Sequence, residues 1–301
     1  MATGAGRYAP SPSGPLHLGN LRTAMLAWLS ARSRGLAFVL RIDDLDRERS
    51  RPEHEQTQLR DLTSLGLDHD GLPLRQSSRT AAYEAAIHRL AEQGLVYPCW
   101  CTRAEIREAA SAPHGPQGRY PGTCRDLTTA ERARRESSRP PPALRIDARA
   151  AAITFTDRHH GPQEQIADDV VVRRGDGTHG YQLATVVDDD HQGITEIVRG
   201  DDLLPSTAAQ IWLIEHLGLR RPEYAHVPLV LGPTGRRLAK RDGAVTLADR
   251  LSLGQSPADV LGMLAASVGI WPAGAPATAT GLLDRYDPGG FVPAPAGRLP
   301  I

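Results

Sequence analysis

Two residues that suit phosphate chemistry stand near opposite ends of the chain. Arginine and lysine together number 35, yet only Lys240, in "RRLAKRDG", is a lysine. All other basic side chains are arginines, which indicates that most of them need only carry a positive charge. A flexible lysine ammonium can follow a moving phosphate chain better than a rigid guanidinium. His17 lies in "LHLGN", close to Asn20, the only asparagine. An imidazole there can face a phosphate, although a histidine in such a short motif, taken alone, is more often a structural residue.

Three cysteines form a second group with its own chemistry. Cys99, Cys101 and Cys124 are the only cysteines and lie close together in the sequence. They would reach one tetrahedral zinc ion if a fourth ligand completed the shell. His114 is a common kind of zinc ligand and lies among them, while free thiols remain the alternative. Because nothing nearby suggests a nucleophile or an open position, we expect the zinc site to be structural.

The elements that must position His17 follow from the pattern around it. "GRYAP" predicts a strand, apolar residues within 21–29 recur at helical spacing, and Gly35 ends that helix. Residues 36–40 form a continuous apolar run, typical of a strand buried on both faces of a parallel sheet. His17 and Gly19 therefore stand where a strand feeds the amino end of a helix, a place that attracts phosphate.

The rest of the chain predicts an α/β domain that is interrupted by an insertion. Residues 79–94 predict a helix, and composition then shifts to Arg, Pro and Gly with short strand candidates at 143–147, 152–156 and 169–174. A buried-strand pattern returns over 180–202, followed by a helix over 207–218 and a strand over 226–232. We expect residues 1–96 and 180–270 to form the two halves of the α/β domain. Residues 97–179 are expected to form an inserted α+β domain that holds the zinc site, and residues 271–301 a loosely packed tail.

Composition limits the setting in which the chain works. The 35 basic and 35 acidic side chains cancel, so no overall field draws the chain to nucleic acid or to an anionic membrane. The opening "MATGAGRYAP" lacks a charged start followed by an apolar core, and no apolar run approaches the length of a membrane span. Three clustered cysteines suit a reducing compartment. We expect a globular cytoplasmic protein with no membrane partner.

Four segments, taken in order, resemble one known family. "RYAPSPSGPLHLGN", "RIDDLD", "YQLATVVDDDHQGITEIVRGDDLL" and "VPLVLGPTGRRLAKRDGA" look like the catalytic domain of class I glutamyl-tRNA synthetases, with "HLGN" in place of HIGH and "RLAKR" in place of KMSKS. The resemblance covers about residues 6–250. It implies a Rossmann-type parallel sheet that binds ATP with Mg²⁺.

The resemblance also assigns residues to the substrates. For ATP it implies His17, Gly19, Asn20, Lys240 and Arg241, with His17 and Lys240 acting in catalysis by balancing charge on the phosphates. For L-glutamate it implies Arg7, Ala9, Ser11, Asp43, Tyr181 and Arg199. Two positions depart from the family: Asp43 stands where Glu is usual, which shortens the reach by one methylene, and Ala239 stands where Ser is common.

Only 60 residues follow Arg241, fewer than the helical anticodon-binding domains of a long synthetase need. The chain therefore most closely resembles the short paralogues, which activate glutamate and transfer it to the queuosine base in the anticodon of tRNA(Asp). Their metal site implies Tyr120 as the fourth zinc ligand beside the three cysteines. We expect a monomer.

Two alternatives share the same motifs. One is a truncated glutamyl-tRNA synthetase that charges the 3′ end of tRNA(Glu), and the other is a non-catalytic, RNA-binding paralogue. Residues 102–149 hold ten arginines against six acidic residues, an excess of four that could contact RNA phosphates, although such runs are more often solvated surface.

Overall fold

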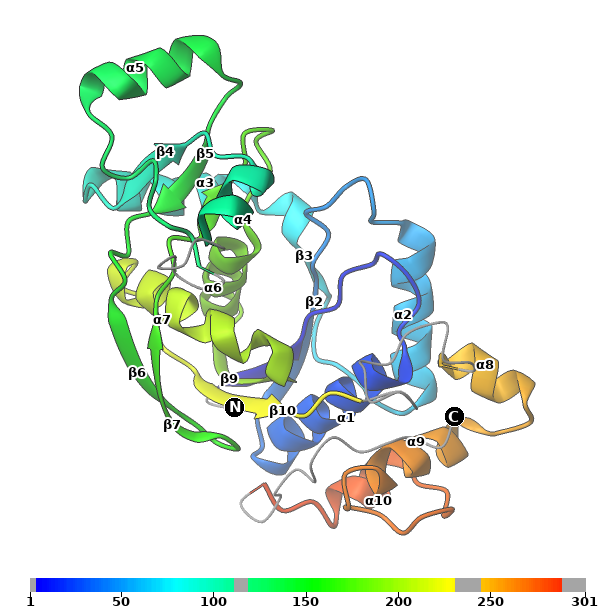
Figure 1. Ribbon diagram of the computed structural model, residues 1–301. Coiled ribbons are helices and arrows are strands. Elements are labelled where there is room, and N and C mark those ends of the chain that lie inside the picture. The colour runs from blue at the N-terminus through cyan, green and yellow to red at the C-terminus, as the bar shows by residue number, and fades with distance from the viewer. Residues whose placement is uncertain (1–3, 111–118, 231–244, 289–301) are drawn as a thin grey trace.

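The computed structural model describes residues 4–110, 119–230 and 245–288, and a seven-stranded sheet forms its centre (Figure 1). In spatial order its strands are β3 (Leu74–Arg75), β2 (Ala37–Ile42), β1 (Ala5–Tyr8), β9 (Ile194–Gly200), β10 (Glu223–Val227), β6 (Ala152–Asp157) and β7 (Gly161–Ile166). All neighbouring pairs are parallel except the last, β6 with β7. The predicted α/β fold with a parallel, Rossmann-type sheet is confirmed.

The helices are mostly short. They are α1 (Leu18–Ser33), α2 (Pro52–Ser64), α3 (Thr80–Glu92), α4 (Arg103–Ala110), α5 (Thr129–Ser138), α6 (Tyr181–His191), α7 (Thr207–His216), α8 (Leu247–Ser252), α9 (Pro257–Ala266) and α10 (Ala279–Leu283), with 3-10 turns at Gln76–Ser78 and Asp201–Ser206. Within the part of the chain that the structure describes, none of these helices combines the length and the apolar character needed to cross a bilayer.

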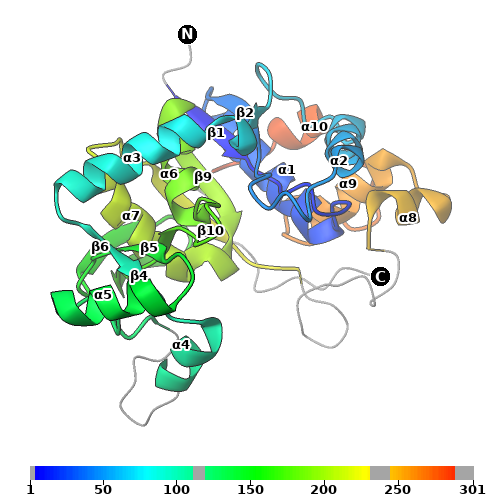
Figure 2. The ribbon, with the colours of Figure 1, turned by 90° about the horizontal axis from the view of Figure 1, so that it is seen from above.

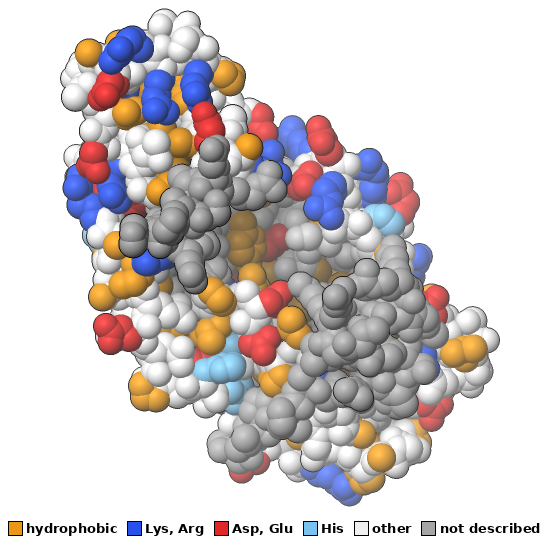
Figure 3. Space-filling view, viewed as in Figure 1, with side chains coloured by type: hydrophobic (Ala, Val, Ile, Leu, Met, Phe, Trp, Pro, Cys, Tyr) orange, Lys and Arg blue, Asp and Glu red, His pale blue; other side chains and the backbone are white. Residues whose placement is uncertain are grey.

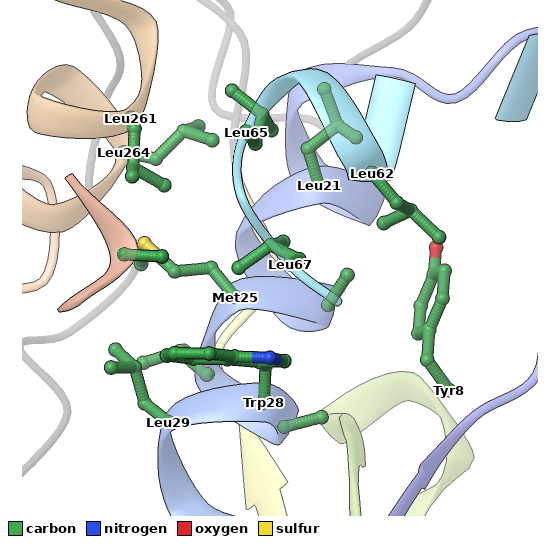
Figure 4. Close-up of a cluster of buried hydrophobic side chains, with 14 of the residues drawn as sticks. Tyr8, Leu21, Met25, Trp28, Leu29, Leu62, Leu65, Leu67, Leu261 and Leu264 are labelled. Carbon is green, nitrogen blue, oxygen red and sulfur yellow. The ribbon is translucent and has the colours of Figure 1, made fainter. Parts of the chain in front are cut away.

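Helix α1 is the crossover that joins β1 to the parallel strand β2, as predicted. Its buried side chains pack between the end of α2 and helix α9 (Figure 4), a contact made by Leu21, Met25, Trp28, Leu29, Leu62, Leu65, Leu67, Leu261 and Leu264. Gly35 follows with a φ of +65°, which residues with a side chain rarely adopt. This packing fixes the amino end of α1 above the carboxyl end of β1.

Two apolar clusters cover the opposite faces of the sheet. Neighbouring residues of one strand belong to different clusters, Tyr224 to that of α3, α6 and α7, and Ala225 to that of α1, α9 and α10. Because successive side chains of a strand point to opposite faces, the helices form one layer on each side. The central part of the sheet is therefore buried on both faces, which fits the largely apolar run of β2, whereas β6 near the edge alternates exposed and buried residues.

A smaller antiparallel sheet lies at one end of the molecule (Figures 1 and 2). It consists of β4 (Val96–Cys99), β5 (Ala143–Ile146) and β8 (Val171–Arg173), with α4 and α5 beside it. Strands β6 and β7 also lie within the predicted insertion 97–179, but they extend the main sheet, since Tyr224 of β10 pairs with Asp157 of β6. The division between the two sheets thus falls inside the predicted insertion.

Two predictions of local structure were wrong. Residues 181–191 form helix α6 rather than a strand, because nearly all sides of this helix are buried and no helical period shows in the sequence. Residues 277–283 are not part of a loose tail, because Ala279 and Leu282 pack into the cluster around α1, at the end opposite the small sheet (Figure 1). Residues 289–301 of that predicted tail lie outside the described residues.

Candidate active site and metal centre

A cavity of about 510 Å³ opens at the carboxyl ends of β1, β2 and β9. Strand β1 pairs with β2 on one side and with β9 on the other, so the cavity lies where the order of the strands reverses, the usual ligand site of such sheets. Nine predicted substrate-binding residues line it: Arg7, Ala9, Ser11, His17, Gly19, Asn20, Asp43, Tyr181 and Arg199. Lys240 and Arg241 lie outside the described residues.

The loop between β1 and α1 is anchored by a glutamine of α2. Gln58 is buried and its amide nitrogen donates to the carbonyl oxygens of Ser11 at 3.0 Å and Gly14 at 2.7 Å. The backbone N–H of Asp43 donates to the carbonyl oxygen of Pro10 at 3.0 Å. These bonds hold the wall formed by Ala9 and Ser11 against the end of β2.

His17 and Asn20 cap helix α1 together. The N–H of Asn20 donates to His17 Nδ1 at 3.2 Å, and the N–H of His17 donates to Asn20 Oδ1 at 3.3 Å. Because Nδ1 accepts a bond, the proton of the neutral imidazole is on Nε2. A Cβ at Gly19 would lie 3.0 Å from the His17 ring, so glycine makes room for this ring. The structure thus gives the single asparagine a capping role, while its contact with ATP stays a prediction.

Both flanks of the segment that carries Lys240 lie beside this cap. Val230, the last described residue before that segment, lines the cavity. On the other flank, Leu18 N–H donates to the carbonyl oxygen of Val245 at 2.7 Å, and His17 forms a β-bridge with Thr246. The chain therefore leaves and re-enters the described structure next to His17.

Four buried charges connect two residues that line the cavity, Arg7 and Asp43. Asp189 Oδ1 accepts from Arg7 Nε at 3.2 Å and from Arg41 Nη1 at 2.5 Å, and Arg41 Nε donates to Asp43 Oδ1 at 2.7 Å. Burial alone would raise the pKa of Asp189, but the charges of Arg7 and Arg41 outweigh burial and hold that pKa below its usual value. For Asp43, burial dominates over Arg41 and raises the pKa. Arg41 therefore offsets the burial of this carboxylate only in part.

Arg199 is short of negative charge. Its side chain is 4% exposed and donates to His226 Nε2 at 2.9 Å, Gln210 Oε1 at 2.7 Å and Thr207 Oγ1 at 2.9 Å. None of these partners is anionic, and no carboxylate of the described residues lies within ion-pair distance of Arg199. Burial lowers the pKa of Arg199. A buried cation without a counter-charge favours an anionic ligand.

Tyr181 lies at the first turn of α6 and is 40% exposed toward the cavity. The residue before it, Gly180, has no room for a side chain, because a Cβ would lie 1.9 Å from the carbonyl oxygen of Val171. This close approach of α6 to β8 sets the position of Tyr181.

Several residues of the site were missed at the sequence level. These are Gln58, Arg41, Asp189, Asp157 and His226. Both Arg41 and Asp189 stood inside recognised motifs, and Arg41 could have been found as a charge that follows an apolar run. Asp157 and His226 carry no local signal, because they meet only through the pairing of β6 with β10.

The three cysteines form one cluster, with their Sγ atoms within 4.8 Å of one another. Tyr120 Oη lies 3.2 Å from Cys99 Sγ and 3.4 Å from Cys101 Sγ, and Cys101 Sγ lies 3.5 Å from Cys124 Sγ. Tetrahedral zinc with bonds of about 2.3 Å needs sulfur atoms about 3.8 Å apart. The cluster can therefore hold a metal ion with little movement. His114, the other predicted fourth ligand, lies outside the described residues.

Arginines surround the cluster. Arg145 Nε donates to Cys99 Sγ at 3.3 Å and Arg135 Nη1 donates to Cys124 Sγ at 3.4 Å. The hydrogen bond with Cys99 lowers the pKa of Cys124 to about 6 and raises that of Cys99 to about 12. Sulfurs that already share protons and face positive charge fit a thiolate-binding metal such as zinc.

Several arginines of residues 102–149 form ion pairs within the protein. Arg125 pairs with Asp169, Arg139 with Glu105, and Arg149 with Asp147. Basic and acidic side chains alternate over this end of the molecule instead of forming a uniform patch (Figure 3). The predicted RNA contact by this excess therefore rests on fewer arginines than the sequence count indicates.

Comparison with known proteins agrees with this geometry. The family described as "tRNA synthetases class I (E and Q), catalytic domain" matches residues 5–264. The chain belongs to this family and is an enzyme of the ligase type. The resemblance predicted from the four motifs is thereby confirmed.

Individual proteins of this family are similar to the chain over most of its length. "Glutamyl-Q tRNA(Asp) synthetase" of Nocardia farcinica is 59% identical over 269 residues, which are 89% of this chain and 86% of that protein. The protein of the same name from Symbiobacterium thermophilum is 48% identical over 296 residues, 94% of this chain and 92% of that protein. A solved glutamate tRNA ligase from Elizabethkingia meningosepticum, in complex with its amino acid, superposes with a TM-score of 0.83 at 27% identity and covers 99% of this chain and 67% of that one.

Proposed function

We propose that the chain activates L-glutamate with ATP and transfers the glutamyl group to the queuosine base in the anticodon of tRNA(Asp). One observation carries the first half: the same cavity holds a buried cation without an anionic partner among the described residues, Arg199, and a buried carboxylate, Asp43, whose ion pair with Arg41 only partly offsets its burial. Glutamate supplies a partner to each, its side-chain carboxylate to Arg199 and its ammonium to Asp43. Arg7 and Tyr181 complete this pocket.

The activation step needs no protein nucleophile. The α-carboxylate of glutamate attacks the α-phosphorus of ATP, the bond to the bridging oxygen breaks, and pyrophosphate leaves, which gives glutamyl-AMP. The residues act by position and charge: His17 and Lys240 balance negative charge on the phosphates, and the amino end of α1 adds its dipole. Mg²⁺, which accompanies ATP, offsets further phosphate charge. Gly19, Asn20 and Arg241 complete the proposed ATP site.

In the second step a hydroxyl of the queuosine cyclopentenediol attacks the glutamyl carbonyl carbon and AMP leaves. The names of the two relatives, which this chain matches over most of their length, support queuosine tRNA(Asp) as the acceptor. We propose a second cavity of about 640 Å³ as the place of the RNA. Its lining includes four arginines and three acidic residues, and it borders the same two segments that carry Asp43 and Tyr181. The charged residues of this lining are Arg47, Arg49, Arg103, Arg174, Asp46, Glu48 and Asp176.

Two assays test this function. Purified protein should exchange pyrophosphate into ATP only when glutamate is present, and absence of this exchange would overturn the proposed activation of glutamate. In transfer, tRNA(Asp) that lacks its 3′ adenosine should still accept glutamate, whereas tRNA without queuosine should not. Glutamate on tRNA(Glu) that disappears with the 3′ adenosine would instead identify ordinary charging.

The metal centre completes the proposal. Cys99, Cys101, Tyr120 and Cys124 would hold one zinc ion, which would tie β4 to the loop before α5. We assign it a structural role, because it lies in the small sheet and its fourth position is filled by a protein oxygen. We also propose that the chain acts as a monomer, which sedimentation at assay concentration would test.

A further inference from the structure

His226, near the carboxyl end of β10, contacts Arg199. Its Nε2 accepts from Arg199 Nε at 2.9 Å, and its Nδ1 lies 2.6 Å from Asp157 Oδ2. The imidazole of His226 and the carboxylate of Asp157 are fully buried. Because a guanidinium can only donate, His226 Nε2 carries the lone pair and the proton is on Nδ1, from which it is donated to Asp157. The imidazole is thus neutral and held in one tautomer.

Asp157 is itself fixed by backbone. Its Oδ1 accepts from the N–H groups of His159 and His160 at 3.0 Å each, and its Oδ2 accepts from the N–H of His226 at 3.1 Å. Burial alone would raise the pKa of Asp157, but these bonds and the imidazole hold it below its usual value. The carboxylate therefore stays an acceptor at neutral pH.

We propose that Asp157 and His226 are positioning residues that set the donor pattern of Arg199 and thereby the affinity for glutamate. The proposal rests on the proposed function, in which Arg199 binds the side-chain carboxylate. Arg199 has five N–H donors, and three of them go to His226, Gln210 and Thr207. Among the described contacts this leaves one N–H on each Nη, a fork for one carboxylate.

The imidazole between Asp157 and Arg199 is neutral, and this matters for binding as much as the direction of its hydrogen bonds. A carboxylate in direct contact with Arg199 would orient it equally well but would cancel the charge that the ligand needs. The neutral imidazole fixes the orientation of Arg199 without placing a negative charge against it, since the carboxylate of Asp157 lies on the other side of the ring. The titratable groups that face His226 are Asp157 and His160 at the end of β6, Arg199 on β9 and Tyr224 on its own strand.

Acid should disrupt this arrangement. Protonation of Nε2 would place an N–H of His226 against the N–H of Arg199 Nε and add a second cation beside the first. Burial lowers the pKa of His226 below its usual value, so the hydrogen bonds of His226 with Asp157 and Arg199 are intact at neutral pH. The KM for glutamate should therefore rise only as pH falls below about 6.5, the ordinary histidine value.

The test begins with Asp157→Asn. The amide oxygen should occupy the place of Oδ1, because two backbone N–H groups of the loop point there. The NH₂ group then faces His226 Nδ1. That group donates, so the proton of His226 moves to Nε2 and the bond to Arg199 is lost. In glutamate-dependent pyrophosphate exchange we expect the KM for glutamate to rise about 10- to 100-fold, with the KM for ATP unchanged. Asp284→Asn, on the exposed end of α10, serves as the matched control.

A second variant separates positioning from mere support of the fold. Gln at 226 can accept from Arg199 through its amide oxygen whatever stands at 157, so His226→Gln should retain most affinity and should abolish the effect of Asp157→Asn in the double variant. His226→Phe, which offers no acceptor, should behave like Asp157→Asn and also serves if that variant does not fold.

The outcomes are distinct. A KM for glutamate within twofold of wild type in both Asp157→Asn and His226→Phe would overturn the inference, as would an equal rise in the KM for ATP or a loss that persists in the double variant. Exchange by the wild-type enzyme would still uphold the proposed function in those cases. Absence of glutamate-dependent exchange in the wild type would overturn the proposed function, and the inference with it.

Discussion

The substitution Arg199→Lys measures directly how the cavity recognises a second carboxylate. Lysine keeps the positive charge but replaces the fork by a single ammonium, and it cannot satisfy His226, Gln210 and Thr207 while also reaching a ligand. At least one charge-assisted hydrogen bond to glutamate is lost, worth about 1.5–3 kcal/mol. At 1.4 kcal/mol per tenfold change, the KM for glutamate should rise roughly 10- to 150-fold.

The assay is pyrophosphate exchange at saturating ATP with glutamate varied, followed by the reverse titration. The KM for ATP should stay constant, because Arg199 lies on β9, whereas the described residues of the proposed ATP site lie at the start of α1. Arg220→Lys, an exposed substitution just before β10, controls for general effects. An unchanged KM for glutamate, or equal changes for both substrates, would refute the assignment of Arg199 to the side-chain carboxylate.

Three further substitutions test other parts of the molecule. Lys240→Arg keeps the charge but loses the flexible ammonium, so adenylate formation should fall by about 10- to 1000-fold in the exchange assay; near-normal exchange would make the single lysine an accident of composition. Cys124→Ser should reduce the zinc content from about one ion per chain and lower the melting temperature, and equal metal in both proteins would remove Cys124 from the shell. Arg49→Gln should raise the KM for tRNA in transfer and leave exchange intact, with Arg60→Gln on α2 as control; equal KM values for tRNA would exclude Arg49 from the RNA site.

The sequence was informative where one segment carries both an element and its chemistry. The strand, turn and helix around His17 were predictable because the strand pattern, the apolar period and Gly35 lie within about thirty positions of one another. Helix α6 was not predictable, since burial on nearly every side removes the polar stripe that reveals a helix. The partner of Arg199 could not be found either, because His226 and Asp157 are separated by 69 positions and meet only in the folded sheet.

The arginine-rich composition acquires a different meaning in the structure. Arginine in place of lysine was interpreted as charge that only needs to be positive, and this is wrong for the buried positions. Arg22 donates to the carbonyl oxygen of Pro228 at 2.5 Å and to Ser267 Oγ at 3.4 Å, Arg41 joins Asp43 to Asp189, and Arg199 has three separate partners.

Each of these three side chains uses at least two nitrogens in fixed directions, which an ammonium at one point cannot reproduce. At these positions the fold requires the planar guanidinium group and its several N–H donors. Lys240 differs because, in the proposed reaction, it follows phosphates that move as pyrophosphate leaves. The same contrast that makes arginine suitable for holding the walls of the cavity makes lysine suitable for the one group that has to move with the substrate.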